Sequence, residues 1–179
     1  MKLLRLIPVL STLTASALAA SANAPAANEE VTVWRAVIAH VAQSERQATS
    51  GIGTLSVLNV SSFPTMPYVQ EQLDQGASKG FCGLSSHESA EILVQLRKQN
   101  TSAVQIDSSV STIPEVVLTS SRPPNGDYLG MSRVVFIASG QAAFLNLDIS
   151  GLSGAIVRVN KVGDDWVAAG ECVEWVTWR

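Results

Sequence analysis

The stretch RVVFIASGQAAFLNLDISGLSGAIVRVNKVGDDWVAAGECVEWVTW, residues 133–178, predicts a β-sheet around which the rest of the chain folds. Four strands are expected within it, at 133–138, 142–149, 155–161 and 166–178, because apolar residues fill these segments and Gly, Ser and Asp fill the short connections. Parallel strands need crossover connections of about a dozen residues or more. The short turns therefore predict an antiparallel meander.

Two amphipathic helices precede this meander. The first begins at Asn28, a good helix cap, and carries apolar residues at three- and four-residue spacing. The second begins at Ser85, which has the capping-box spacing with Glu88. We expect an α+β domain in two layers, with an antiparallel meander of about four to six strands packed by two main helices, and a cystatin-like cone as one candidate arrangement. Shorter strands are expected at 54–60 and 115–118.

The first residues have the three-part pattern of a secretory signal peptide. Lys2 and Arg5 give a cationic start, an apolar stretch follows over residues 3–18, and small residues come next. Cleavage is favoured over a retained anchor, because a membrane-spanning helix needs about 20 apolar residues. We expect a signal peptide over residues 1–22, a flexible N-terminus over 23–27 and a single domain over 28–179, with a cut after Ala19 as an alternative to one after Ala22.

The charge of the chain argues against two classes of partner. It has 12 Lys and Arg against 15 Asp and Glu, a formal net charge of −3, and no basic cluster after Arg5. Nucleic acids and anionic membranes both require clustered Lys and Arg. We expect a periplasmic or secreted protein with no nucleic-acid partner, no membrane association after cleavage, and an unknown small molecule or protein as its partner.

The two cysteines, Cys82 and Cys172, are expected to form a disulfide, because an even pair in an oxidising compartment is most simply bridged. The alternatives are a redox pair or a metal site. However, there is no Cys-x-x-Cys motif, and Cys82 with His87 lacks the two further ligands that zinc needs. Glycine motifs that bind phosphates or dinucleotides are absent as well. We therefore expect no metal and no cofactor.

No catalytic constellation stands out in the sequence. Residues 151–155 depart from the serine-hydrolase motif Gly-x-Ser-x-Gly at the fifth position. His40 lies beside the apolar stripe of the first predicted helix, and His87 lies at the start of the second, so each has an ordinary structural role. The acidic residues near strand ends are expected to be solvated surface carboxylates: Asp148, Asp164, Asp165, Glu171 and Glu174.

Three tryptophans, Trp166, Trp175 and Trp178, fall in the last predicted strand. Aromatic side chains exposed on one sheet face can form a binding platform for sugars or peptides. Alternation places Trp175 and Trp178 on opposite faces of a regular strand, so at least one belongs to the core. Core packing is the favoured interpretation, and a binding surface is the alternative.

Several short motifs follow one another along the chain: VWRAVI at 33–38, SRVVF at 132–136, QAAFL at 141–145, GLSG at 151–154, Trp166-Val167 and Trp175-Val176-Thr177. Their order and spacing resemble a family of exported bacterial proteins of uncharacterised function, mostly over the C-terminal part of the chain. The resemblance implies export and an antiparallel meander, but no chemistry. It also implies that Ser150 and Ser153 stand where many relatives have two cysteines, which act there as a local structural clamp. Here the turn either holds without that clamp, or the pair Cys82 and Cys172 replaces it.

Three classes of function are open. The leading hypothesis is a non-enzymatic exported domain that binds a small ligand or another protein through the concave side of a curved sheet. The alternative is a periplasmic hydrolase whose site is built around His40 or His87 with Ser and Asp residues. A structural or assembly role is the third.

Overall fold

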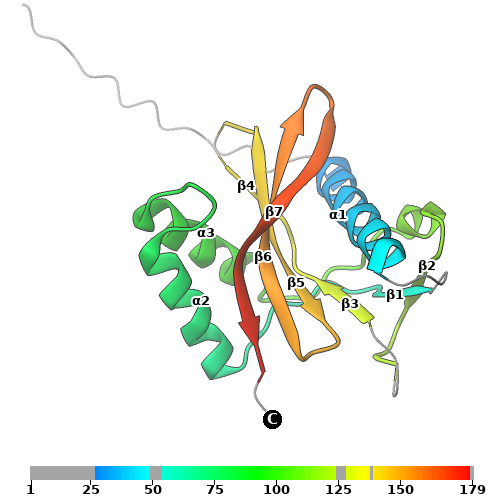
Figure 1. The fold of residues 1–179 in the computed structure, drawn as a ribbon, viewed down its shortest axis with the longest axis horizontal. Helices are drawn as coiled ribbons and strands as arrows, with labels where there is room; N and C mark the ends of the chain where they lie inside the picture. Colours follow the sequence, from blue (N-terminus) through cyan, green and yellow to red (C-terminus); the bar gives the residue numbers. More distant parts are fainter. Residues whose placement is uncertain (1–26, 49–53, 124–127, 138, 178–179) are drawn as a thin grey trace, which may run out of the picture.

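The described part of the chain forms three helices and a seven-stranded sheet, which confirms the predicted α+β class (Figure 1). This computed structural model describes residues 27–48, 54–123, 128–137 and 139–177. The predicted signal peptide over 1–22 lies outside the described residues. The helices are α1 (Ala27–Ala48), α2 (Pro67–Lys79) and α3 (Ser86–Gln99), with a 3-10 helix, η1 (Ser108–Thr112). The strands are β1 (Leu55–Leu58), β2 (Val116–Thr119), β3 (Tyr128–Met131), β4 (Val135–Phe136), β5 (Ala142–Ile149), β6 (Ser153–Val162) and β7 (Asp165–Val176).

The sheet has the strand order β2-β1-β3-β5-β6-β7, and β4 also pairs with β5. β5, β6 and β7 pair antiparallel across short turns, which confirms the predicted meander. β1 pairs in parallel with both β2 and β3, because the long connection through α2, α3 and η1 brings the chain back in the same direction. The strand predicted at 133–138 is shorter than expected and is limited to β4, and β3 was not predicted.

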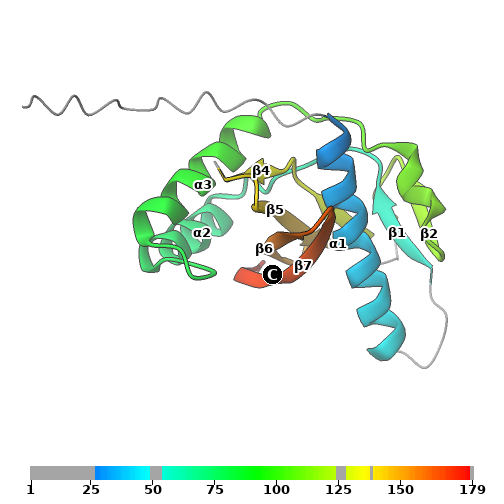
Figure 2. The ribbon, with the colours of Figure 1, turned by 90° about the horizontal axis from the view of Figure 1, so that it is seen from above.

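Helices cover both faces of the sheet, which corrects the predicted two-layer arrangement. α1 lies on one face and the α2–α3 pair on the other (Figure 2). Along β5, Leu145 and Leu147 pack in the core with α1, whereas Phe144 packs in the core with α2 and α3. Every residue from 142 to 148 is therefore buried. The result is three layers around two hydrophobic cores, and the suggested cystatin-like cone is not confirmed.

The local sequence explains where the helices begin and what they bury. α3 has the predicted capping box, in which the Glu88 N–H donates to Ser85 Oγ at 3.3 Å and the Ser85 N–H donates to the Glu88 carboxylate at 2.8 Å. α1 buries Trp34 and Ile38, which its helical spacing places on one face. α2 has Pro67 in its first turn, where the missing N–H costs no hydrogen bond. Among the described residues, no helix has the length and apolarity of a membrane span.

Candidate binding groove

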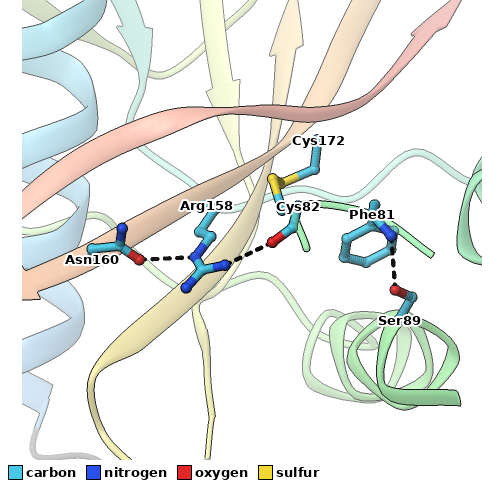
Figure 3. Close-up of a disulfide and its surroundings, with 6 residues drawn as sticks. All are labelled: Phe81, Cys82, Ser89, Arg158, Asn160 and Cys172. Carbon is cyan, nitrogen blue, oxygen red and sulfur yellow. Dashed lines mark hydrogen bonds between the residues drawn. A yellow bond between two sulfur atoms is a disulfide. The ribbon is translucent and has the colours of Figure 1, made fainter. Parts of the chain in front are cut away.

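The predicted disulfide is present and joins the two helices on one face to the last strand. Cys82, in the loop between α2 and α3, is bonded to Cys172 on β7, 90 residues later in the chain (Figure 3). Arg158 supports the loop, because its Nη1 donates to the Cys82 carbonyl at 2.6 Å and its Nε donates to Asn160 Oδ1 at 2.8 Å (Figure 3). Both cysteines pack against the α2–α3 core, so the surroundings of the bridge are those of a structural disulfide.

Two of the three late tryptophans lie in opposite cores. Trp166 is 6% exposed in the core beneath α1, and Trp175 is 1% exposed in the core beneath α2 and α3. The Trp175 Nε1–H donates to Asn146 Oδ1 at 2.9 Å, which satisfies its polar end inside the protein. Trp166 and Trp175 therefore share no exposed surface, because the sheet itself separates them. Trp178 lies outside the described residues.

The two histidines do not meet. His40 is exposed on α1, and His87 is exposed in the first turn of α3, on the other side of the sheet. The His87 imidazole lies 3.3 Å from the Glu91 carboxylate, a surface pair one helical turn apart. Within the described ranges, no three His, Cys, Asp or Glu side chains are grouped so that they could hold a metal ion.

Asp148 is buried, which corrects the expectation of a solvated carboxylate. It is 7% exposed, because β5 has helices on both faces and neighbouring strands on both edges. Its Oδ1 accepts a hydrogen bond from the Gly151 N–H at 2.7 Å and so fixes the β5–β6 turn. Burial raises the pKa of Asp148, while the Gly151 hydrogen bond and the Arg122 charge act in the opposite direction. The other four acidic residues named with it, Asp164, Asp165, Glu171 and Glu174, are exposed as expected.

Tyr128 lies beside this carboxyl at the start of β3. It is 5% exposed, and its hydroxyl has no hydrogen-bond partner among the described residues. The Arg122 guanidinium lies 5.4 Å from its ring centroid, over the ring face. Burial, and then the negative charge of Asp148, raise the pKa of Tyr128, so the phenol stays protonated at neutral pH. Arg122, Tyr128 and Asp148 thus form a cluster that holds the β5–β6 turn to the chain before β3. The alternation of apolar residues in the sequence could not predict this cluster, because alternation does not show which faces of a sheet are covered.

One hollow in the described part of the chain is a groove between α1, the ends of β1 and β2, and the segment 104–108. Its volume is about 580 Å³. A second hollow is lined by residues of α2 alone. The groove is the better candidate because four separate parts of the chain build its walls, which gives a ligand contacts on several sides. Its lining residues are Glu30, Val31, Trp34, Asn59, Val104, Gln105, Ile106, Asp107, Ser108 and Leu118.

Polar contacts fix the α1 side of the groove. The Trp34 Nε1–H donates to the Ser132 carbonyl at 3.0 Å, so the orientation of the buried indole is set. The Glu30 carboxylate accepts from the Val134 N–H at 2.8 Å and from Arg133 Nη2 at 3.2 Å. These bonds satisfy Glu30, which is only 8% exposed, and they anchor the first turn of α1 to the β3–β4 connection.

The opposite wall, residues 104–108, is fixed to the segment that follows β1. The Ile106 N–H donates to the Asn59 carbonyl at 2.8 Å, and the Val104 N–H donates to Ser61 Oγ at 2.9 Å. Asp107 accepts from the Ser109 N–H at 2.7 Å at the start of η1, and this contact with Ser109 lowers the pKa of Asp107. An exposed, ionised carboxylate therefore lines the groove on this side.

The sequence did not reveal this groove, because its walls come from segments about 75 residues apart that are joined only in the folded chain. In comparisons with known proteins, no protein-family model, no curated protein and no solved structure matches the chain. The resemblance to exported bacterial proteins therefore stays a prediction. The function has to be argued from the groove itself.

Proposed function

We propose that this chain is an exported binding domain that holds a small molecule in the groove beside α1, without catalysis. The observation that carries the proposal is the groove, whose volume of about 580 Å³ falls within the range of about 300–1,000 Å³ typical of small-molecule sites. An exported location is supported by the Cys82–Cys172 disulfide, because such bridges persist in oxidising compartments.

The lining favours an apolar molecule with a cationic or hydrogen-bond-donating end. Val31, Val104 and Leu118 are partly exposed and provide apolar surface, and the Asp107 carboxylate stands ionised at the rim. Glu30 does not compete for the charged end of a ligand, because Arg133 and the Val134 N–H already satisfy it. The Asp107 carboxylate, whose charge the neighbouring Arg35 guanidinium partly offsets, therefore favours a hydrogen-bond-donating or cationic end on the ligand.

The groove is preorganised on both sides, which favours binding. The Trp34–Ser132 contact holds the helix wall, and the Ile106–Asn59 contact holds the opposite wall. A ligand that enters walls already in place loses less affinity to ordering side chains and loops. We do not propose the hydrolase alternative, because no contact of His40 or His87 favours it.

Native mass spectrometry of the full chain, purified from the compartment in which it accumulates, tests this proposal. The expected result is a small molecule retained by the wild type and lost from Leu118→Arg, which places a charge in the groove. Val117→Arg is the matched control, because Val117 is the neighbouring residue of β2, is 51% exposed and is not part of the lining. The proposal would be contradicted if Leu118→Arg retained the molecule as well as the wild type does. It would also be contradicted if the wild type retained no molecule, or if it bound none of a set of apolar amines.

A further inference from the structure

We infer that the outer edge of β7 binds an extended, basic segment of another protein, which pairs with β7 as an additional strand. β7 is the last strand in the sheet order. Figure 2 shows it at the rim of the sheet, between α1 on one side and the α2–α3 pair on the other, with no described strand beyond it. The edge of a terminal strand presents backbone N–H and C=O groups that a further strand can pair with.

The register identifies the backbone groups that are free. The Lys161 N–H donates to the Gln141 carbonyl on the β5 side at 2.9 Å, so the backbone groups of Lys161 point away from β7. Its partner in register, Trp166, therefore directs its own N–H and C=O to the outer edge, and alternation gives Ala168 the same direction. No hydrogen bond joins these outer groups to another part of the described chain.

The other end of the same edge already shows the pairing that a partner would make. Gln72 Nε2 donates to the Val176 carbonyl at 3.0 Å, and the Val176 N–H donates to Gln72 Oε1 at 3.2 Å. The glutamine amide thus occupies the place of a neighbouring strand at Val176. The Cys82–Cys172 bridge ties a loop beside the middle of the strand. The open part of the edge is therefore residues 165–169.

The side chains around the open edge define the partner. Val162 and Val167 are 62% and 49% exposed, and the register places them on the same face of the β6–β7 hairpin. Two exposed carboxylates lie next to them, Asp164 in the turn and Asp165, which is paired in register with Val162. Two more, Glu171 and Glu174, lie further along the strand on its other face, and none of the four forms an ion pair with a described residue. An extended segment in which Lys or Arg alternates with apolar residues matches both features.

The same carboxylates disfavour a second copy of this chain as the occupant. Pairing two β7 edges would place Asp165 and Glu171 of one copy close to the acidic residues of the other. The β6–β7 register shifts twice, between Ile156 and Val157 and between Arg158 and Val159, and Gly170, which lies opposite Arg158, has a positive φ of 140°. These irregularities also bend the strand and shorten the flat edge. Acidic residues and bulges of this kind limit self-association of edge strands, so a basic segment of a different protein is favoured.

Titration of the ¹⁵N-labelled full chain with two capped hexapeptides, Lys-Val-Lys-Val-Thr-Val and Glu-Val-Glu-Val-Thr-Val, tests the inference. We expect the basic peptide to shift the amide signals of Trp166 and Ala168 saturably, with an affinity that falls as salt rises, and the acidic peptide to leave them in place. Equal binding of the two peptides, no binding of the basic one, or shifts that omit these two amides would overturn the inference.

Two variants make the test specific. Ala168→Pro removes one outward N–H, and binding of the basic peptide is expected to weaken about fivefold, as on the loss of one typical hydrogen bond. Asp165→Asn with Glu171→Gln changes only exposed side chains, so the fold is kept, and it should weaken binding about threefold or more and reduce the salt dependence.

Glu91→Gln, an equally conservative change on the exposed side of α3, is the matched control and should leave the affinity unchanged. Unchanged affinity in the Asp165→Asn/Glu171→Gln variant contradicts the inference even where Ala168→Pro fails to fold. Self-association of the wild type that Ala168→Pro abolishes would identify a second copy as the occupant and would also overturn it.

Discussion

Removing the disulfide by the double substitution Cys82→Ser/Cys172→Ser should lower the free energy of unfolding by about 4–5 kcal/mol. The bridge joins residues 90 positions apart, and the loop-closure entropy of a loop of that length gives this magnitude at 25 °C. The native contacts should survive, because Arg158 still bonds the Cys82-loop carbonyl and both positions still pack against the α2–α3 core. The effect therefore arises chiefly in the unfolded chain.

Urea unfolding followed by circular dichroism measures this effect. With a urea dependence of about 2 kcal/mol per M, the midpoint should fall by about 2 M in the double variant. The oxidised wild type treated with dithiothreitol should show the same fall, and the double variant should not respond to dithiothreitol. A midpoint change below about 0.5 M, or a variant that still responds to the reductant, would refute the reasoning.

Three further predictions concern buried positions. Burial raises the pKa of Asp148, so the folded chain binds this proton more tightly than the unfolded chain and the free energy of unfolding falls as pH rises through the folded-state pKa. Asp148→Asn keeps an acceptor for the Gly151 N–H and carries no charge, so it should be more stable than the wild type at pH 7. Well below pH 3.8, the ordinary pKa of an aspartate, the two proteins should be equally stable. Thermal melts in which the variant is less stable at pH 7 would contradict this prediction. Gly154→Ala would place a Cβ against both the backbone oxygen of Leu147 and the ring of Trp175, and it should cost about 3 kcal/mol or more in urea unfolding; a neutral result would show that the strand backbone and the indole can both move aside. Glu30→Ala leaves a buried N–H and a guanidinium without their acceptor and should cost about 2 kcal/mol, with Glu30→Gln costing less; equal losses would mean that the hydrogen bonds do not matter.

The sequence was sufficient for the elements whose signal is local. Alternating apolar residues located β5 at 142–149 and β6 and β7 within a few residues, and the Ser85–Glu88 spacing located the start of α3. The disulfide followed from there being two cysteines in a chain expected to be exported. These features depend on neighbours in sequence or on counting, so no knowledge of the fold was needed.

What the sequence could not give depends on contacts between distant segments. An apolar row on β5 predicted one covered face, but only the folded chain shows that α1 and the α2–α3 pair cover opposite faces. For that reason Asp148 was expected at the surface and is buried, and Trp166 and Trp175 lie in different cores. β3 is four residues long and contains Gly130, so it carried too little periodic signal to be predicted.

The groove depends on such distant contacts as well, and mapping a bound ligand onto it tests the functional account most directly. The ¹⁵N-labelled full chain, titrated with an apolar amine and with the carboxylic acid of the same skeleton, should show saturable amide shifts with the amine at Trp34, Ile106 and Leu118. These shifts should be lost in Leu118→Arg and kept in Val117→Arg. Binding of the acid as tight as that of the amine, or amine shifts that fall elsewhere and persist in Leu118→Arg, would contradict the account.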